Sequence, residues 1–179
     1  MGNPLNLPFD PIERAHDNWS QRWGASSAMA AVTSLMRAQQ ILIGELDGAL
    51  KPFGLTFARY EALVLLTFSS SGSLPLGKIG ERLMVHPTSV TNTIDRLEGQ
   101  GLVLRRPNPS DGRGVLAEIT GAGREVTEEA TQALLGMDFG LGCYSDEELW
   151  RMHEMFTRLR VDFGDFPAPV PAAEAAERG

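Results

Sequence analysis

The sequence predicts a mainly α-helical fold that carries one small β-hairpin. Apolar residues recur at spacings of three and four over most of the chain, a pattern typical of amphipathic helices. Strand-like runs occur at 102–106 and 114–119, on either side of a stretch rich in turn-forming residues. The chain has 179 residues, of which 42% are hydrophobic and 22% charged, so it is long enough for one substantial globular core.

The N-terminal part is predicted to form a short helix and a long one. Over 9–24, Trp19 and Trp23 lie on one apolar stripe behind the cap-like pair Asp10-Pro11. A longer apolar stripe covers 28–50, and the turn formers at 51–54 end it. We expect the two tryptophans to pack this arm onto a partner subunit, with a ligand cavity as the alternative.

The middle of the chain is predicted to contain three helices and the hairpin. Thr56 is the expected cap of the first helix. Apolar residues then recur at helical spacing over 76–83 and again over 90–97, with His86-Pro87 at the start of the last helix and Gly99 at its end. The connector at 107–113 is rich in Pro, Asn, Asp and Gly. Two short helices followed by such a hairpin form a winged helix-turn-helix.

The C-terminal part is predicted to form two further helices and a tail. Thr120 precedes a helix over 121–137, and Ser145 opens a final helix with acidic residues in its first turn. From Leu149 to Phe163 the apolar positions follow a 3, 4, 3, 4 spacing, which is a coiled-coil-like seam. The outer helices hold more apolar surface than a small winged helix covers. We therefore predict a homodimer through the N- and C-terminal helices, with a monomer that buries both stripes as the alternative.

The net charge of −7 looks unfavourable for a nucleic-acid-binding protein, but its distribution is not. Residues 76–120 contain six Lys and Arg residues against five Asp and Glu residues, so the acidity lies mostly outside this region. The field that phosphates meet is local, and acidic bulk elsewhere weakens non-specific DNA binding more than specific binding. The charge pattern therefore allows double-stranded DNA as a partner.

The predicted DNA contacts lie at the start of the second short helix and on the wing. In a dimer with recognition helices about 34 Å apart, both enter successive major grooves of a pseudo-palindromic site. Asn92 is suited to an adenine edge, Arg113 at the wing tip to a narrow minor groove, and the amides near Thr88 to a phosphate. A solvated helix face is the alternative for these polar residues. The candidate DNA-binding residues are Lys78, His86, Pro87, Thr88, Ser89, Thr91, Asn92, Arg96, Arg105, Arg106, Asp111 and Arg113.

The acidic residues of this region need separate roles, because free carboxylates repel DNA. A solvated helix face is the better interpretation for Asp95. Asp111 is expected to orient Arg113 or to hold Arg96, so Asp111→Ala should weaken DNA binding although it removes a negative charge. Of the neighbouring Arg105 and Arg106, which alternate on the strand, one is expected to contact phosphate while the other pairs locally.

Several motifs resemble one known family. The wing residues Gly101-Leu102-Val103, Arg105-Arg106, Asp111-Gly112-Arg113 and Ile119-Thr120 are similar to the wing signature of the MarR family of transcriptional regulators, and Val90-Thr91 with Asp95-Arg96-Leu97-Glu98 resembles its recognition helix. The resemblance covers about residues 28–163. It implies a triangular homodimer, usually a repressor, whose DNA affinity is lowered by a small, often aromatic or anionic effector. Asn92 departs from the arginine of many members, and Gly112 interrupts a commonly doubly basic wing tip.

The same resemblance implies a ligand cleft between the dimer helices and the winged head. The candidate ligand-binding residues are Trp23, Met36, Arg37, Arg59 and Tyr60. A core methionine and surface arginines are the plainer interpretation of these side chains. The predicted organisation is an N-terminal arm and dimerisation helix at 1–54, a DNA-binding winged head at 55–120, dimerisation helices at 121–165 and a loose tail at 166–179.

Other function classes lack a supporting pattern in the sequence. The three histidines lie in separate segments, with no metal-ligand spacing, phosphate loop or nucleophile motif, so we expect no enzyme, no metal and no cofactor. The single Cys143 excludes an internal disulfide, and the absence of a signal-peptide pattern and of a long apolar run predicts a cytoplasmic protein without a membrane span. Two alternatives stay open: a redox-responsive regulator that acts through Cys143, and a winged helix used for protein association. The plainer interpretation of Cys143 is a buried, inert thiol.

Overall fold

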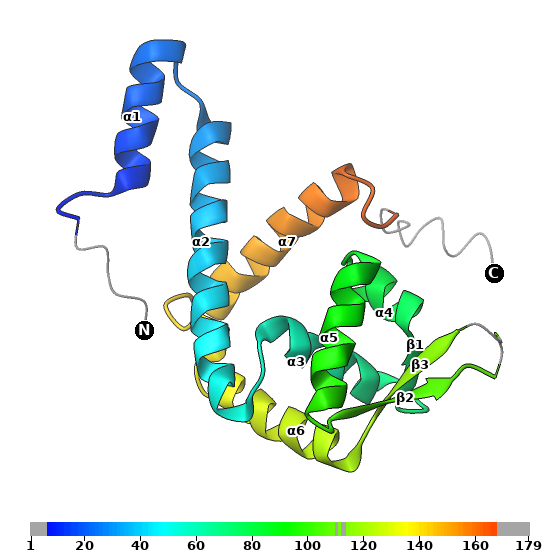
Figure 1. Cartoon of the computed structure of the whole chain (residues 1–179). Coiled ribbons are helices and arrows are strands. Elements are labelled where there is room, and N and C mark those ends of the chain that lie inside the picture. Colours follow the sequence, from blue (N-terminus) through cyan, green and yellow to red (C-terminus); the bar gives the residue numbers. More distant parts are fainter. Residues whose placement is uncertain (1–6, 110, 112–113, 168–179) are drawn as a thin grey trace. The chain divides into compact units, whose positions relative to one another are not determined.

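The computed structural model describes residues 7–109, 111 and 114–167, which form two compact units on either side of Gly140 (Figure 1). The first unit contains helices α1 (Pro11–Trp23), α2 (Ser27–Leu50), the 3-10 turn η1 (Lys51–Phe53), α3 (Phe57–Phe68), strand β1 (Ser73–Pro75), α4 (Leu76–Leu83), α5 (Pro87–Gly99), β2 (Val103–Pro107), β3 (Val115–Ile119), α6 (Gly121–Leu135) and η2 (Asp138–Gly140). The second unit contains α7 (Asp146–Asp162). The predicted mainly α-helical fold with a hairpin wing is confirmed.

Most helices begin where the sequence places a cap. Asp10 accepts the amide of Ile12 at 2.8 Å, Thr120 accepts that of Gly123 at 2.9 Å, and Ser145 forms a reciprocal capping box with Glu148. The two hydrogen bonds from Ser145, that of its backbone amide first, lower the pKa of the Glu148 carboxyl. These starts are determined by residues within three positions of one another, so the sequence alone predicts them.

One predicted cap is wrong. Thr56 lies at the N-cap position of α3, but its side chain makes no capping hydrogen bond. The carboxylate of Asp47, near the end of α2, instead accepts the amide of Phe57 at 2.7 Å. A carboxylate is the stronger acceptor and favours the positive end of the helix dipole, so it takes the place of the local hydroxyl.

The wing hairpin belongs to a three-stranded antiparallel sheet with the order β1-β3-β2. The predicted hairpin pairs Val103 with Ile119 and Pro107 with Val115. The third strand, β1, was not predicted from the sequence. Its three residues pair with β3 from Ser73 opposite Glu118 to Pro75 opposite Leu116. A segment this short has no alternating pattern of its own, and only its pairing with β3 makes it a strand.

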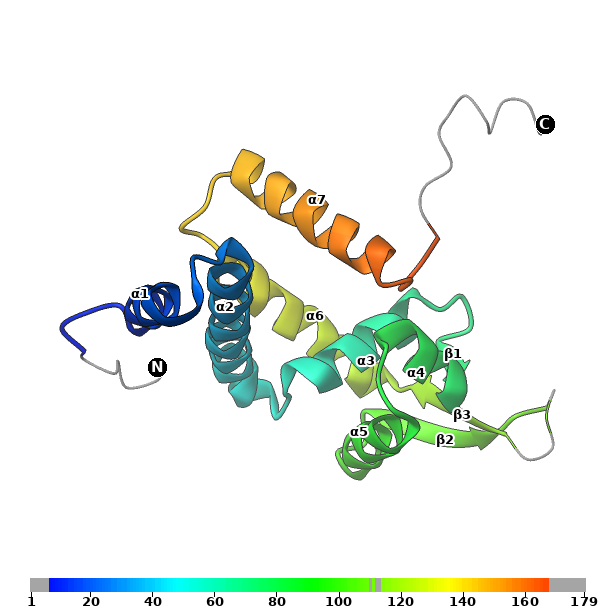
Figure 2. The same cartoon turned by 90° about the horizontal axis from the view of Figure 1, so that it is seen from above.

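The core of the first unit lies between the helices of the winged head, the sheet and α6 (Figure 2). The predicted inward residues of α5, Val90, Ile94 and Leu97, are all buried. Leu46 and Leu50 at the end of α2 belong to the same core. The last turn of α2 is therefore part of the winged head, while the rest of this helix extends away from it.

Helix α1 runs beside the N-terminal half of α2 (Figure 1). Ile12, His16 and Ser20 are its half-buried residues, whereas Trp19 and Trp23 are 37% and 66% exposed and pack on each other with ring centroids 4.8 Å apart. Among the described residues the tryptophan stripe is therefore only partly covered. Among the described residues, no helix is both long and apolar enough to cross a membrane.

Candidate nucleic-acid interface

Helix α5 presents a polar face opposite its buried one. His86 and Pro87 at its start are exposed, as are Thr88, Ser89, Thr91, Asn92, Asp95 and Arg96 along the helix. The turn between α4 and α5 contains Met84 in the left-handed conformation, with φ of 53°. This arrangement of two helices, followed by a paired hairpin, is the geometry that places one helix in a major groove and a wing beside it.

The first turn of α5 uses its own backbone donors. The Nδ1 atom of His86 accepts the amide of Thr88 at 3.3 Å, and the carbonyl of His86 accepts the amide of Ser89 at 2.8 Å. Pro87 has no amide hydrogen. A phosphate would have to displace these hydrogen bonds, and the expected phosphate contact of the amides near Thr88 and Ser89 stays a prediction. The side chains of His86, Thr88 and Ser89 remain exposed at this turn.

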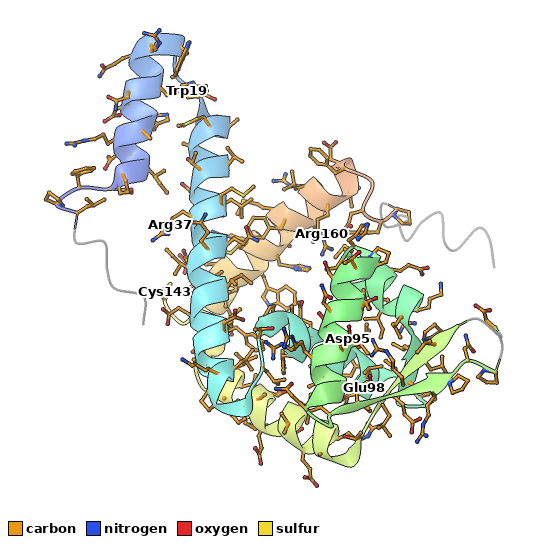
Figure 3. All side chains as sticks on the ribbon, viewed as in Figure 1. Trp19, Arg37, Asp95, Glu98, Cys143 and Arg160 are labelled. Atoms are coloured by element: carbon orange, nitrogen blue, oxygen red, sulfur yellow. The ribbon has the colours of Figure 1, made fainter. Side chains whose placement is uncertain are left out.

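Arg105 ties the wing to the recognition helix. Its Nη1 lies 2.6 Å from Asp95 Oδ1 and 2.6 Å from Glu98 Oε2, and its backbone amide donates to Glu98 Oε1 at 3.2 Å. Figure 3 labels Asp95 and Glu98 on α5. Burial acts to lower the pKa of Arg105, but the hydrogen bonds and charges of the two carboxylates outweigh it and raise this pKa. Asp95 is thus ion-paired, which corrects the expectation of a solvated residue.

The other strand arginine is also paired. Arg106 Nε lies 3.1 Å from Glu118 Oε2 on β3, so both arginines pair locally in this structure, and the expected phosphate contact of one of them stays a prediction. Lys78 on α4 likewise lies 2.7 Å from Glu81. Both of these pairs are exposed, and exposed ion pairs contribute only about 0–1 kcal/mol, so a phosphate can replace either carboxylate. Arg105, in contrast, is 26% exposed and bound to two carboxylates, which favours a bracing role over a phosphate contact.

Two exposed arginines of the winged head make no ion pair within the part of the chain that the structure describes. Arg96 lies beside Asn92 and Asp95 on a polar groove of α5, and Arg82 lies in the last turn of α4. The sequence analysis names Arg96 but not Arg82 as a candidate DNA contact. The spacing could have identified it, because Arg82 follows Lys78 by one helical turn and lies on the same face of α4.

The tip of the wing is described only in part. Arg113 and Gly112 lie outside the described residues. The amide of Asp111 donates to the carbonyl of Asn108 at 3.2 Å, and its own carbonyl accepts the amide of Gly114 at 2.8 Å. The roles expected of Asp111 toward Arg113 or Arg96 stay predictions.

The five candidate ligand residues lie on three helices. Tyr60 is buried, with its hydroxyl 2.9 Å from Thr131 Oγ1. Arg59 donates to the carbonyl of Gly54 at 2.9 Å, and Arg37, labelled in Figure 3, donates to Gln40 at 3.2 Å. Met36 on α2 is 52% exposed, and Trp23 on α1 projects into solvent as described above. None of the five hydrogen-bonds another within the described residues, and their role in ligand binding stays a prediction.

Cys143 lies in the loop before α7 and is exposed (Figure 3). This corrects the expectation of a buried thiol. In the described ranges there is also no group of three or more His, Cys, Asp or Glu side chains placed to hold a metal ion.

A small cavity of about 60 Å³ lies beneath the start of α5. Glu61 of α3 lines it together with Ser89 and Thr93 of α5, and the remaining lining residues are apolar. Although Glu61 reaches solvent, burial raises the pKa of its carboxyl above the ordinary value of 4.5. The charged carboxylate is therefore less favourable here than in the unfolded chain.

Glu61→Gln is expected to raise the midpoint of thermal unfolding at pH 7. A carboxyl whose pKa is raised on folding gives stability that is present below its ordinary pKa and is lost as the pH rises through the folded value. The gain should therefore vanish below about pH 4. Melting curves of both proteins between pH 3.5 and 8 measure this, with Glu129→Gln, an exposed carboxylate on α6, as the control. Equal gains from both variants at pH 7 would contradict it.

Comparison with known proteins identifies the family. The MarR family model matches residues 58–115, which include the helix-turn-helix and the first part of the wing. Sco5413, a MarR family transcriptional regulator from Streptomyces coelicolor, has a structure 66% identical in sequence that aligns over 78% of this chain and 96% of its own, with a TM-score of 0.73. The chain belongs to the MarR family. MarR-family proteins are transcriptional regulators, so the predicted class, a DNA-binding regulator rather than an enzyme, is confirmed.

Two further MarR-type structures share the fold. Sco3205 from Streptomyces coelicolor, solved in complex with DNA, is 22% identical, with a TM-score of 0.72 over 82% of this chain and 96% of that one. CouR from Rhodococcus jostii RHA1, solved with bound p-coumaroyl-CoA, is 25% identical, with a TM-score of 0.66 over 82% of this chain and 100% of that one.

Proposed function

We propose that this MarR-family regulator is a repressor that binds a pseudo-palindromic operator as a homodimer and is released by a small effector. The DNA-binding part of this proposal rests on one observation. The polar face of α5 lies beside the wing, and the ion pairs of Arg105 link the wing to the same helix. Two such surfaces related by a two-fold axis would contact successive major grooves of one site.

Uncovered apolar surface supports the homodimer. Trp23 is 66% exposed on α1 and Met36 52% on α2. In the second unit, Leu159 and Phe163 of the predicted seam are 47% and 81% exposed on and just after α7. Helices from both ends of the chain thus hold apolar faces that a second copy would cover, as their apolar spacing predicts.

A small aromatic or anionic effector is proposed from the family and from one relative. CouR is known with p-coumaroyl-CoA, which is both aromatic and anionic. An effector releases DNA only if it binds more tightly to a dimer whose recognition surfaces are wrongly spaced. Trp23, Met36, Arg37, Arg59 and Tyr60 remain the residues proposed for such binding.

The test is selection of bound sequences from a random DNA pool, followed by affinity measurements against salt concentration. We expect an inverted repeat with half-site centres about 10 base pairs apart. Arg113→Ala should reduce the slope of log affinity against log salt by about one unit, because one phosphate contact is lost. No enriched sequence and a flat salt response would refute operator binding and favour the use of this winged helix for protein association.

A further inference from the structure

The segment between α2 and α3, residues 51–56, joins the helix proposed for dimerisation to the winged head. On its apolar side, Leu55 is buried with Leu50 in the core of the head, and the amide of Leu55 donates to the carbonyl of Leu50 at 3.2 Å. This packing anchors the last turn of α2 in the head. It does not by itself fix the direction in which the two helices around the segment point.

Two side chains bind the polar side of the same segment at Gly54, and a third binds the residue that follows it. Asp47 of α2 accepts the amide of Phe57, the first residue of α3, at 2.7 Å. The carbonyl of Gly54 accepts two hydrogen bonds of 2.9 Å, one from Arg59 Nη1 and one from Gln100 Nε2. Gln100 directly follows α5 and is its C-cap. One carbonyl of the junction is therefore bound to the end of the recognition helix, 46 residues away in the sequence.

Gly54 is suited to this contact by its backbone. Its φ of 70° lies in the left-handed region, which glycine adopts without strain. A Cβ at this position would lie 2.9 Å from Gln100 Nε2, so a side chain would displace the amide that holds the carbonyl. The left-handed conformation of Gly54 and its lack of a side chain both allow Gln100 to reach the Gly54 carbonyl.

The polar contacts of the junction contribute less to the free energy of folding than the apolar ones. Asp47 is half-buried, and the two hydrogen bonds to Gly54 are exposed. Exposed hydrogen bonds contribute little to folding because water replaces them readily. They still restrict direction, because each needs its donor within about 3.5 Å and near a straight line with the acceptor. They therefore bias orientation by no more than this small free energy, which a dimer supplies twice.

We propose that Asp47 and Gln100 are positioning residues that set the direction of α5 relative to α2, and thereby the spacing of the two recognition helices. This inference rests on the proposed function, since spacing has meaning only in a dimer that reads two half-sites. Asp47 fixes the start of α3 to α2, and Gln100 fixes the end of α5 to the junction. A dimer without these contacts would have to order its two heads on binding the operator.

The experiment uses the full-length protein and three kinds of DNA: a single half-site, the selected operator, and operators with one or two base pairs added or removed between half-sites. For Asp47→Ala and Gln100→Ala we expect about a ten-fold loss of affinity for the operator and less than about a two-fold change for the half-site. Their affinities should also vary less with spacing than those of the parent protein.

Two matched variants serve as controls. Asp47→Asn should retain parent behaviour, because asparagine caps a helix about as well as aspartate. Thr56→Ala should also bind as the parent does, since its side chain makes no capping hydrogen bond in α3. If Asp47→Ala fails to fold, Gln100→Ala decides, because the Gln100 side chain is exposed.

The outcomes separate the two proposals. Equal losses on half-site and operator, or an unchanged dependence on spacing in Gln100→Ala, would overturn the positioning role while the dimeric operator function stands. A parent protein that binds the operator no better than a half-site would instead overturn the dimeric function, and the positioning role with it.

Discussion

Gly123→Ala is expected to lower the free energy of unfolding by about 3 kcal/mol. Gly123 is buried in the first turn of α6, where a Cβ would collide with the carbonyl oxygen of Leu102 and approach Ile119 Cγ1 at 2.8 Å. The Leu102 carbonyl cannot move away freely, because it accepts the amide of Thr120 at 3.0 Å and the Thr120 hydroxyl at 3.1 Å.

Urea denaturation followed by circular dichroism measures this effect, and Gly121→Ala is the matched control. Gly121 lies in the same turn of α6, and a Cβ there meets no atom within 4 Å. The control should therefore change the free energy of unfolding by less than about 0.5 kcal/mol. Equal midpoints for Gly123→Ala and the parent protein would show that α6 shifts away from the wing at little cost.

Arg105→Ala is expected to weaken operator binding by about ten-fold or more at moderate salt. The substitution removes the guanidinium that neutralises Asp95 and Glu98. Two unpaired carboxylates would then stand on the recognition helix, near the phosphates, and β2 would lose its ionic link to α5. The cost in stability should be smaller, about 1 kcal/mol, because both carboxylates are partly exposed.

Fluorescence anisotropy on the selected operator, at several salt concentrations, tests this prediction against Arg106→Ala. That control removes the same charge from the next residue of the strand, but it leaves only Glu118 on β3 unpaired. We expect the loss to be larger for Arg105→Ala, and Asp95→Asn should restore part of it in the Arg105→Ala background. If Asp95→Asn restores no binding in the Arg105→Ala background, Arg105 acts as a phosphate contact and not as a brace.

The elements that the sequence predicted correctly depend on residues close to one another along the chain. The apolar spacing of α5, its start at His86-Pro87 and the capping box at Ser145 each involve positions within a few residues. Helical periodicity and capping are local interactions, so they are present in the sequence before any tertiary contact forms. The polar face of α5 follows directly, because it is the side left after Val90, Ile94 and Leu97 turn inward.

The tertiary structure alone decided the contacts between distant segments. Strand β1 exists because β3 offers it a pairing edge, and Asp47 caps α3 from ten residues away where the local Thr56 was expected. The pairing of Arg105 with α5, and the need for glycine at 123, likewise depend on which segments meet. Such contacts are determined by the packing of whole elements, and no pattern within a short window of sequence specifies them.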